Sequence, residues 1–362
     1  MIQDGAKTQR IAWPDYARGI AIILVVMGHS IESLIFAKIL PDFTAWQFIF
    51  SWIYSFHMPV FFLMSGIFFL RTAARPPKIF FFDKIRTLVY PYFLWSLIQS
   101  FILVAMANYT TGSHSFVNLQ DLILNPQAQF WFLYSLFLLD IFFFVLYKAR
   151  LSTKFFLPIA LAIYILVFIL TGNLWSVESH FAYLVTQTLT GMIYFSFGIL
   201  FGTAILSRLP RVQTSVLLVI TVATYLMLGV LVAGGAYAPA SWAFLLLSIL
   251  GVVGTVALSI LLERAKKAAV IKYLGTKSLP IFLLSMIASS GIRIGMDKFL
   301  HLRWSGWIYL VAAILAGILF PLFLDWFFTR ISFKYAFVWP QRNQEPKPIR
   351  RDSNVQKESY LA

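Results

Sequence analysis

Long runs of apolar residues, separated by short polar breaks, follow one another from about residue 19 to residue 328. A helix needs about 20 apolar residues to cross the hydrocarbon core of a bilayer. Measured against that length, the runs predict ten transmembrane helices. Their predicted ranges are 18–36, 46–70, 85–107, 128–147, 154–171, 184–206, 212–234, 240–262, 277–297 and 305–329. The first run carries Arg18, His29 and Glu32 and shows no small-residue cleavage site, so we expect it to stay as a helix and not to be removed as a signal peptide.

The composition supports the same interpretation. Of the 362 residues, 60% are apolar and only 12% are charged, whereas a soluble globular chain carries about twice that share of charge. We therefore predict an all-α membrane protein with a single bundle of about ten transmembrane helices over residues 18–329. Residues 1–17 are expected to be a cytoplasmic N-terminal segment, and the polar, charged residues 330–362 a disordered cytoplasmic tail. The chain has no Cys, which excludes disulfides, thiolate metal sites and thiol nucleophiles.

The net charge of +15 alone would suit a nucleic-acid partner, but the positions of the cations favour membrane topology. Of the 29 Lys and Arg residues, 25 fall in alternate inter-span segments and the termini, and the other four are Lys38, Arg293, Lys298 and Arg303. Because Lys and Arg collect on the cytoplasmic side, this alternation predicts a multi-pass protein of the cell inner (plasma) membrane with both termini in the cytoplasm. No nucleic-acid partner is expected.

The first predicted helix carries ionisable residues, which are costly inside a membrane and are functional candidates for that reason. Arg18 and His29 are eleven positions apart, which is within about 20° of three whole turns and about 16 Å along the axis. Glu32 extends the same face outward, and Asp15 is placed to pair with Arg18. His29 suits acid–base or acyl-accepting chemistry because a neutral imidazole has one basic nitrogen. The alternative is that Arg18 reaches the inner headgroups and His29 only holds a helix contact.

The second predicted helix contains the string SFHMPVFFLMSG, with His57, Pro59, Ser65 and Gly66. Proline and glycine loosen a membrane helix, and only neighbouring protein or a water-lined cavity can compensate. This string predicts either a structural kink or the wall of a substrate path.

Five cations cluster from the end of the second predicted helix to the start of the third: Arg71, Arg75, Lys78, Lys84 and Arg86. Such a cluster could bind a ligand with several phosphates, or could serve topology alone. Elsewhere, Asp140, Asp325 and the i, i+4 pair of Arg293 and Asp297 are interpreted as structural ion pairs. His114, His180 and His301 show no metal-ligand spacing, and we predict no metal site.

Several strings together resemble one family. RIAWPDYARGIAIILVVMGH, FHMPVFFLMSG, KIRTLVYPYFLW, QFWFLYSLFL and LGTKSLPIFLLS follow in this order over about residues 10–330. They resemble the acyltransferase 3 family of integral membrane acyltransferases, and the opening looks most like its fucose 4-O-acetylase-related branch. The late string departs from the family pattern, which often ends in His where this chain has Ser285.

The resemblance implies ten spans and transfer of an acyl group, most often acetyl from cytoplasmic acetyl-CoA, to a hydroxyl on the outer side. It implies that His29 is the catalytic residue and Arg18 its inner-face associate, with Glu32 on the same face. Arg86, Ser65 and Gly66 would lie near the acyl-donor path, and Trp131 would match a supporting position. The cluster adds Arg71, Arg75 and Lys78 to the donor-binding candidates, and Asp15 and His57 complete the supporting residues.

The predicted partners are therefore acyl-CoA, membrane lipids and a glycan, exopolysaccharide or lipid-linked sugar acceptor, with no permanently bound cofactor. The sequence leaves open whether His29 acts as a general base or accepts the acyl group itself. A transporter or flippase for a glycan or lipid-linked intermediate is the main alternative, because many spans, broken helices and a polar stripe also describe substrate pathways. A non-catalytic scaffold would leave the Arg18–His29 face unexplained.

Overall fold

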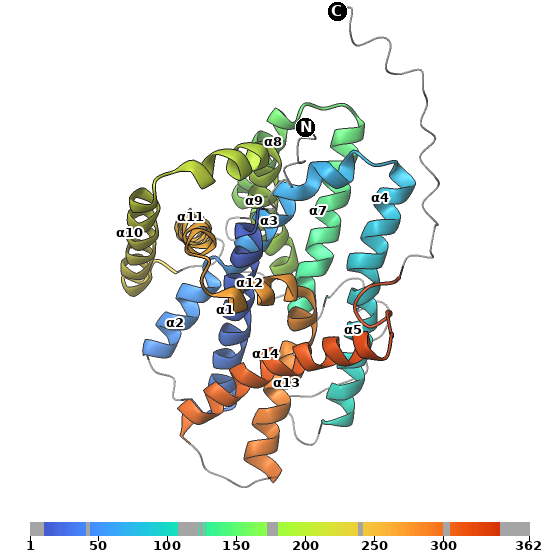
Figure 1. Ribbon diagram of the computed structural model, residues 1–362, viewed down its shortest axis with the longest axis vertical. Helices are drawn as coiled ribbons and strands as arrows, with labels where there is room; N and C mark the ends of the chain where they lie inside the picture. Colours follow the sequence, from blue (N-terminus) through green and yellow to red (C-terminus); the bar gives the residue numbers. More distant parts are fainter. Residues whose placement is uncertain are drawn as a thin grey trace, which may run out of the picture.

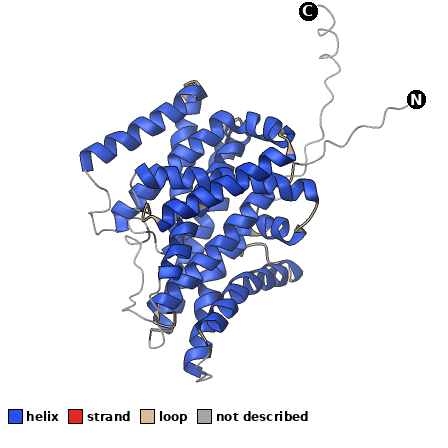
Figure 2. Ribbon diagram, turned by 90° about the vertical axis from the view of Figure 1, so that its left-hand side faces the viewer, coloured by secondary structure: helices blue, strands red, loops and turns tan. Residues whose placement is uncertain are grey.

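The computed structural model describes residues 11–40, 44–107, 122, 126, 128–171, 180–237, 242–299 and 305–340. All regular secondary structure in these residues is helical (Figure 2). Nine helical segments of this part of the chain are long and apolar enough to cross a membrane, and Thr153–Ile169 forms a shorter apolar helix. The predicted all-α membrane bundle is confirmed. Of the predicted N-terminal segment 1–17 and the predicted tail 330–362, residues 1–10 and 341–362 lie outside the described residues.

Helix α1 (Trp13–Phe36) runs through the bundle and contacts α3, α11, α12, α13 and α14 (Figure 1). It begins five residues before the predicted start. Pro14 occupies the first turn, where a missing N–H costs no hydrogen bond, and the Asp15 carboxylate faces the positive end of the helix dipole. Because the helix begins early, Arg18 lies more than one turn inside it.

The second predicted span is two helices, α2 (Thr44–Tyr54) and α3 (His57–Ala73), separated by a turn at residues 55–56. Pro59 explains the position of the break. It has no N–H to bond to the carbonyl four residues earlier, but it fits the first turn of a new helix. Gly66, which also suggested a loosened helix, lies inside an unbroken part of α3.

The third span starts earlier than predicted. Helix α4 (Pro77–Lys84), a π-helical turn (Ile85–Val89) and α5 (Tyr90–Ala105) form one continuous segment from Pro77 to Ala105. Lys78 and Lys84, which precede the predicted span 85–107, therefore lie on this helical segment together with Arg86.

The other long helices complete the bundle: α7 (Trp131–Lys148), α8 (Phe156–Thr171), α9 (His180–Arg208), α10 (Thr214–Ala233), α11 (Trp242–Ala265), α13 (Ser278–Ile294) and α14 (Gly306–Arg330). Short 3₁₀ turns, Ala128–Phe130, Thr153–Phe155 and Leu209–Arg211, flank α7, α8 and α9, and a π-helical turn, Gly295–Phe299, follows α13. The short helix α12 (Ala269–Thr276), which the hydrophobic pattern did not predict, packs across α1 (Figure 1).

Glycine residues bring two pairs of helices into backbone contact. A Cβ atom at Gly66 would lie 2.0 Å from the carbonyl oxygen of Phe195, so α3 and α9 meet backbone to backbone. A Cβ atom at Gly275 would lie 1.7 Å from the carbonyl oxygen of Asp15, which fixes α12 against the beginning of α1. Small residues allow this close approach between membrane helices.

The chain folds back after α14. Trp95 Nε1 donates a hydrogen bond to the carbonyl of Ala336 at 2.8 Å, Tyr90 donates to the carbonyl of Tyr335 at 2.7 Å, and the N–H of Trp339 donates to the carbonyl of Arg86 at 3.2 Å. The first residues of the segment predicted to be a disordered tail thus pack against the start of α5.

Candidate active site

Two cavities meet at the predicted catalytic histidine. They share five lining residues, which are His29, Glu32, Tyr54, Gln129 and Trp131. The first, of about 470 Å³, is called the polar cavity here; it is further lined by Ser33, Phe36, Leu103, Ala128, Met286, Ser289, Ser290 and Arg293. The second, of about 410 Å³, is called the apolar cavity; it is further lined by Phe50, His57, Met58, Pro59, Gln187, Tyr237, Phe244 and Phe282. The two adjoining cavities therefore have the His29 imidazole in their common wall.

The polar cavity lies toward one end of the bundle. It contacts the last residue of α1, Phe36, the last turn of α5 at Leu103, and the last turn of α13 at Arg293, together with Ala128 just before α7. In the orientation predicted from the cations, each of these helix ends lies on the outer side.

A triangle of polar side chains forms the junction of the two cavities. Tyr54, the last residue of α2, donates its hydroxyl proton to Glu32 Oε2 at 2.8 Å. The same hydroxyl oxygen lies 2.9 Å from His29 Nδ1, and His29 Nδ1 lies 3.3 Å from Glu32 Oε2. The predicted neighbours His29 and Glu32 are thus brought into contact, and Tyr54 joins them from another helix.

These contacts favour one tautomer of His29. A tyrosine hydroxyl has one proton, which is assigned to the bond with the Glu32 carboxylate. With that assignment Nδ1 of His29 carries a proton, which it donates to the Tyr54 oxygen and toward the Glu32 carboxylate. In the neutral imidazole Nε2 is left with a free lone pair. The arrangement resembles the base and orienting-acid part of a catalytic triad.

His57 is fixed by a hydrogen bond across the turn between α2 and α3. Its Nδ1–H donates to the carbonyl of Ile53 at 2.8 Å, its side chain is buried, and its ring packs edge-on against Tyr54 with centroids 4.9 Å apart. It lines the apolar cavity and packs against Tyr54, and its supporting role stays a prediction.

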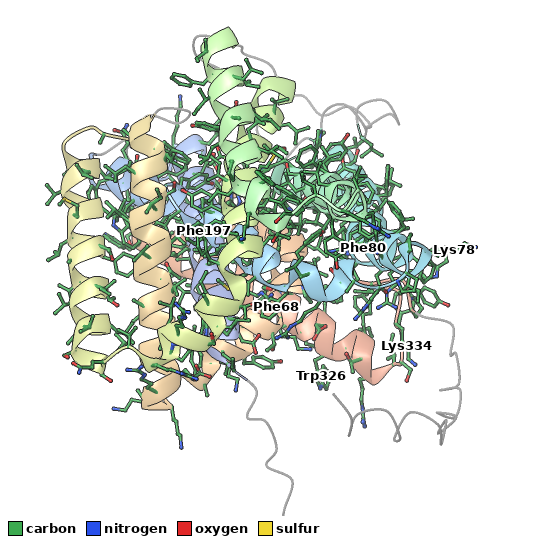
Figure 3. All side chains as sticks on the ribbon, turned by 90° about the horizontal axis from the view of Figure 1, so that it is seen from above. Phe68, Lys78, Phe80, Phe197, Trp326 and Lys334 are labelled. Atoms are coloured by element: carbon green, nitrogen blue, oxygen red, sulfur yellow. The ribbon has the colours of Figure 1, made fainter. Side chains whose placement is uncertain are left out.

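Arg18 lies in a separate cluster nearer the beginning of α1. Its guanidinium is 3.8 Å from the Asp15 carboxylate and 5.4 Å from the ring centroid of Phe68 on α3. Arg71 lies over the same ring at 5.3 Å. Phe68 thus brings two predicted site arginines together, and Figure 3 shows it among the helices. Neither arginine lines the polar or the apolar cavity.

The Asp83 carboxylate on α4 contacts two of the predicted donor-binding cations, Arg75 just before α4 and Arg86 in the π-helical turn. Asp83 contacts Arg75 Nη1 at 2.6 Å through one oxygen and lies 3.7 Å from Arg86 Nε through the other. Lys78 is exposed and points away from the bundle at the edge of the molecule (Figure 3). The structure thus groups Arg75 and Arg86 and separates Lys78 from them.

The remaining predicted positions divide between the site and helix packing. Trp131, in the first turn of α7, lines both cavities. The Ser65 hydroxyl donates to the carbonyl of Phe61 at 2.9 Å, and Gly66 makes the close contact with α9. Ser285, where the family pattern often has His, is buried in α13 and lines neither cavity.

Two of the predicted ion pairs form between helices. Lys84 Nζ lies 2.8 Å from the buried Asp140 carboxylate, and Lys277 Nζ lies 2.6 Å from Asp325. The predicted direct pair of Arg293 and Asp297 is wrong, because Asp297 instead lies 3.7 Å from Lys298. Across the described residues, no group of three or more His, Asp or Glu side chains is placed to hold a metal ion.

Sequence reasoning missed three residues of the site: Tyr54, Gln129 and Arg293. Tyr54 directly precedes the SFHMP string at the helix break, and Gln129 is the first residue of the QFWFLYSLFL string, where only Trp131 was singled out. Gln129 Nε2 donates to Gln99 Oε1 at 3.1 Å, and Gln129 is buried. Arg293 was assigned to an ion pair. In each case the signal was a polar residue close to the end of a predicted helix or to a break within one.

The comparisons with known proteins agree with the resemblance. A family model described as an acyltransferase domain, that of the acyltransferase 3 family, matches residues 11–326. No curated protein and no solved structure matches the chain. The matched range begins before α1 and ends inside α14, so it includes both cavities and every predicted site residue.

Proposed function

The chain belongs to the acyltransferase 3 family and is a membrane-bound acyltransferase; on that basis we propose that it moves an acyl group, acetyl by preference, from cytoplasmic acyl-CoA to a hydroxyl at the outer face of the plasma membrane. The acceptor class in this proposal is a glycan, exopolysaccharide or lipid-linked sugar. Membership of the fucose 4-O-acetylase-related branch belongs to the same proposal and rests on the opening string alone.

The observation that carries the proposal is the His29–Tyr54–Glu32 triangle at the junction of the two cavities. An acyl transfer needs a base next to the acceptor hydroxyl and space for the thioester on its other side. Nε2 of His29 supplies the base, and two cavities adjoin the ring. Glu32 and Tyr54 hold the Nδ1–H and stabilise the imidazolium that forms.

In the proposed reaction His29 acts as a general base for acyl transfer from the thioester to the acceptor hydroxyl. Nε2 of His29 takes the proton of the acceptor hydroxyl while that oxygen forms a bond to the thioester carbonyl carbon. The carbon–sulfur bond then breaks, the sulfur leaves as the coenzyme thiolate, and the imidazolium returns its proton to that sulfur. The products are the O-acyl acceptor and free coenzyme A.

The cations at the other end of the bundle are proposed to bind the acyl-CoA donor. Arg75 and Arg86, held by Asp83, and the pair Arg18 and Arg71 around Phe68 supply charge for the coenzyme phosphates. Arg18 and His29 are eleven positions apart on α1, which is about 16 Å along the axis. A donor with a long, thin arm suits that separation, and the pantetheine arm of coenzyme A has this form.

The test is acylation of surface glycans in cells that carry or lack the gene, measured by mass spectrometry. Restoring the parent gene should restore the acyl mass increment. His29→Ala should lower the rate by about 10² to 10⁴ because it removes the general base, with equal amounts of protein found in the membrane fraction by immunoblot. An inserted His29→Ala protein that acylates near the parent rate would overturn the mechanism.

A further inference from the structure

Arg293 is a buried cation that faces the polar cavity. It lies in the last turn of α13, its relative exposure is 9%, and it lines the same cavity as His29 and Glu32. Its Nε is completely buried and has no hydrogen-bond partner, and no carboxylate in the described part of the chain lies within ion-pair distance of its guanidinium. The charge is therefore uncompensated by direct contact.

The carboxylate closest along the helix, Asp297, attracts Arg293 electrostatically but makes no direct ion pair with it. Asp297 is four residues later, but the backbone changes to a π-helical turn at Gly295, which takes Asp297 off the regular α-helical spacing. Its carboxylate lies beside the exposed Lys298. Glu32, in the same cavity, is engaged by Tyr54 and His29.

An arginine guanidinium stays charged at every physiological pH. The buried Nε of Arg293 has no hydrogen-bond partner, so the guanidinium is only partly solvated, and an arginine of this kind within a membrane protein marks a place where an ion or charged substrate binds. The fork of N–H donors on arginine matches the two oxygens of a carboxylate or phosphate. Ser290 and Gln129 add polar groups to the same cavity wall.

The position of Arg293 separates it from the proposed donor cluster. Arg86 lies near the start of the helical segment that continues past Leu103, and Leu103 shares the polar cavity with Arg293. The helix from Arg86 to Leu103 is about 25 Å long. Coenzyme phosphates held at Arg86 are therefore remote from Arg293, and the anion at Arg293 has to be part of the other substrate.

We propose that Arg293 binds a negatively charged group, a carboxylate or phosphate, of the acyl acceptor. The charged group anchors the acceptor in the polar cavity and leaves a hydroxyl of the same molecule beside His29. This inference rests on the proposed acyltransferase function and narrows its acceptor to anionic molecules. The charge has two sources, an acidic sugar residue of a glycan or the phosphate of a lipid-linked sugar.

The absence of Cys from the chain allows a direct electrostatic test. Ser290→Cys places a single thiol in the polar cavity, and Ser33→Cys is a second reporter in the same wall. In purified protein in lipid nanodiscs, thiol modification is timed with an anionic sulfonate-bearing methanethiosulfonate and with its trimethylammonium analogue. We expect the anionic-to-cationic rate ratio to fall by about tenfold in Arg293→Gln, because a unit charge acts strongly on a charged reagent at short range.

Lys298→Gln is the matched control, since Lys298 is an exposed cation beyond the same helix and is paired with Asp297. It should change the ratio little. A ratio that is the same in the parent and Arg293→Gln, for both reporter positions, would overturn the proposal.

Protection experiments identify the source of the charge. Galacturonate and a short-chain polyprenyl phosphate are each tested for slowing of Ser290→Cys modification, with galactose as the neutral control. Protection by galacturonate indicates an acidic glycan, and protection by the polyprenyl phosphate indicates a lipid-linked acceptor. In either case the protection must be lost in Arg293→Gln. Protection by acetyl-CoA alone, or by none of these probes, overturns the assignment of the anion to the acceptor.

These measurements need no turnover, so they separate the two proposals. His29→Ala should abolish acyl transfer and leave the charge selectivity of labelling unchanged. Arg293→Gln should abolish the charge selectivity whether or not acyl transfer is the reaction. Failure of the first result counts against the proposed function, and failure of the second counts against the anion site.

Discussion

Replacing Tyr54 by Phe tests whether the triangle of polar groups orients the catalytic imidazole. The substitution removes only the hydroxyl that bridges His29 Nδ1 and Glu32 Oε2. The aromatic ring keeps its stacking on Phe50, with centroids 3.9 Å apart, and its contact with His57. The change therefore removes hydrogen bonds and preserves packing.

The expected loss of acyl-transfer rate follows from the contacts that the Tyr54 hydroxyl makes. A hydrogen bond to a charged group contributes about 1.5–3 kcal/mol, which corresponds to a rate factor of about 10 to 150 if the bond acts in the transition state. His29 Nδ1 keeps its direct approach to Glu32 Oε2 at 3.3 Å, so we expect the lower end of that range, about tenfold. Glu32→Gln removes the negative charge itself and should cost more, with His29→Ala at about 10² to 10⁴.

The assay is the initial rate of acyl transfer from labelled acetyl-CoA in membrane vesicles, normalised to inserted protein. Tyr225→Phe is the matched control, because it removes a tyrosine hydroxyl bonded to Thr255 at 3.0 Å, far along the chain from the triangle and outside both cavities. A Tyr54→Phe rate equal to that of the parent and of Tyr225→Phe would refute the reasoning. So would a Glu32→Gln variant that is faster than Tyr54→Phe.

Three further predictions follow from the packing, the cations and the topology. Gly66→Ala should lower the free energy of unfolding by about 1–3 kcal/mol, because the added Cβ would overpack against the Phe195 carbonyl. The measurement is the unfolding temperature in detergent. Gly291→Ala is the control and should have little effect, because open space surrounds Gly291. Arg86→Gln should weaken acetyl-CoA binding, measured by calorimetry in nanodiscs, more than Arg150→Gln, and equal effects would remove the case for a specific site. A thiol introduced by Ala236→Cys, after α10, should react with an impermeant reagent added outside intact cells; reaction only from the cytoplasmic side would reverse the predicted orientation.

The fold was largely predictable because the membrane imposes a strong length requirement on apolar runs. The errors occur at features that hydropathy does not report. The π-helical turn joins α4 to α5 through the charged segment around Lys84 and Arg86, and apolar stretches alone could not show that the helix starts at Pro77. Helix α12 was missed because eight residues are too few for a span, and it is stabilised by its contact with α1 and not by its own hydrophobicity.

The site was predictable only where its residues share one helix. His29 and Glu32 are three apart on α1, so helical spacing by itself places them together. Arg18 is on the same helix, but its contacts are with Asp15 and Phe68, and spacing could not show which end of the helix holds the cavity. Gln129 and Arg293 come from other parts of the chain, and only the tertiary packing brings them to His29.

The break in the second span links the fold to the proposed chemistry. An unbroken helix over residues 44–73 would have no free end near His29, and Tyr54 would be an ordinary helical position. Because Pro59 has no N–H to donate to the preceding turn, α2 stops at Tyr54, and α3 begins at His57. The end of α2 presents the Tyr54 hydroxyl to Glu32 and His29, and the buried His57 ring holds Tyr54 from the other side. The proline that suggested a kink in the sequence thus accounts for the position of Tyr54, which the sequence did not reveal.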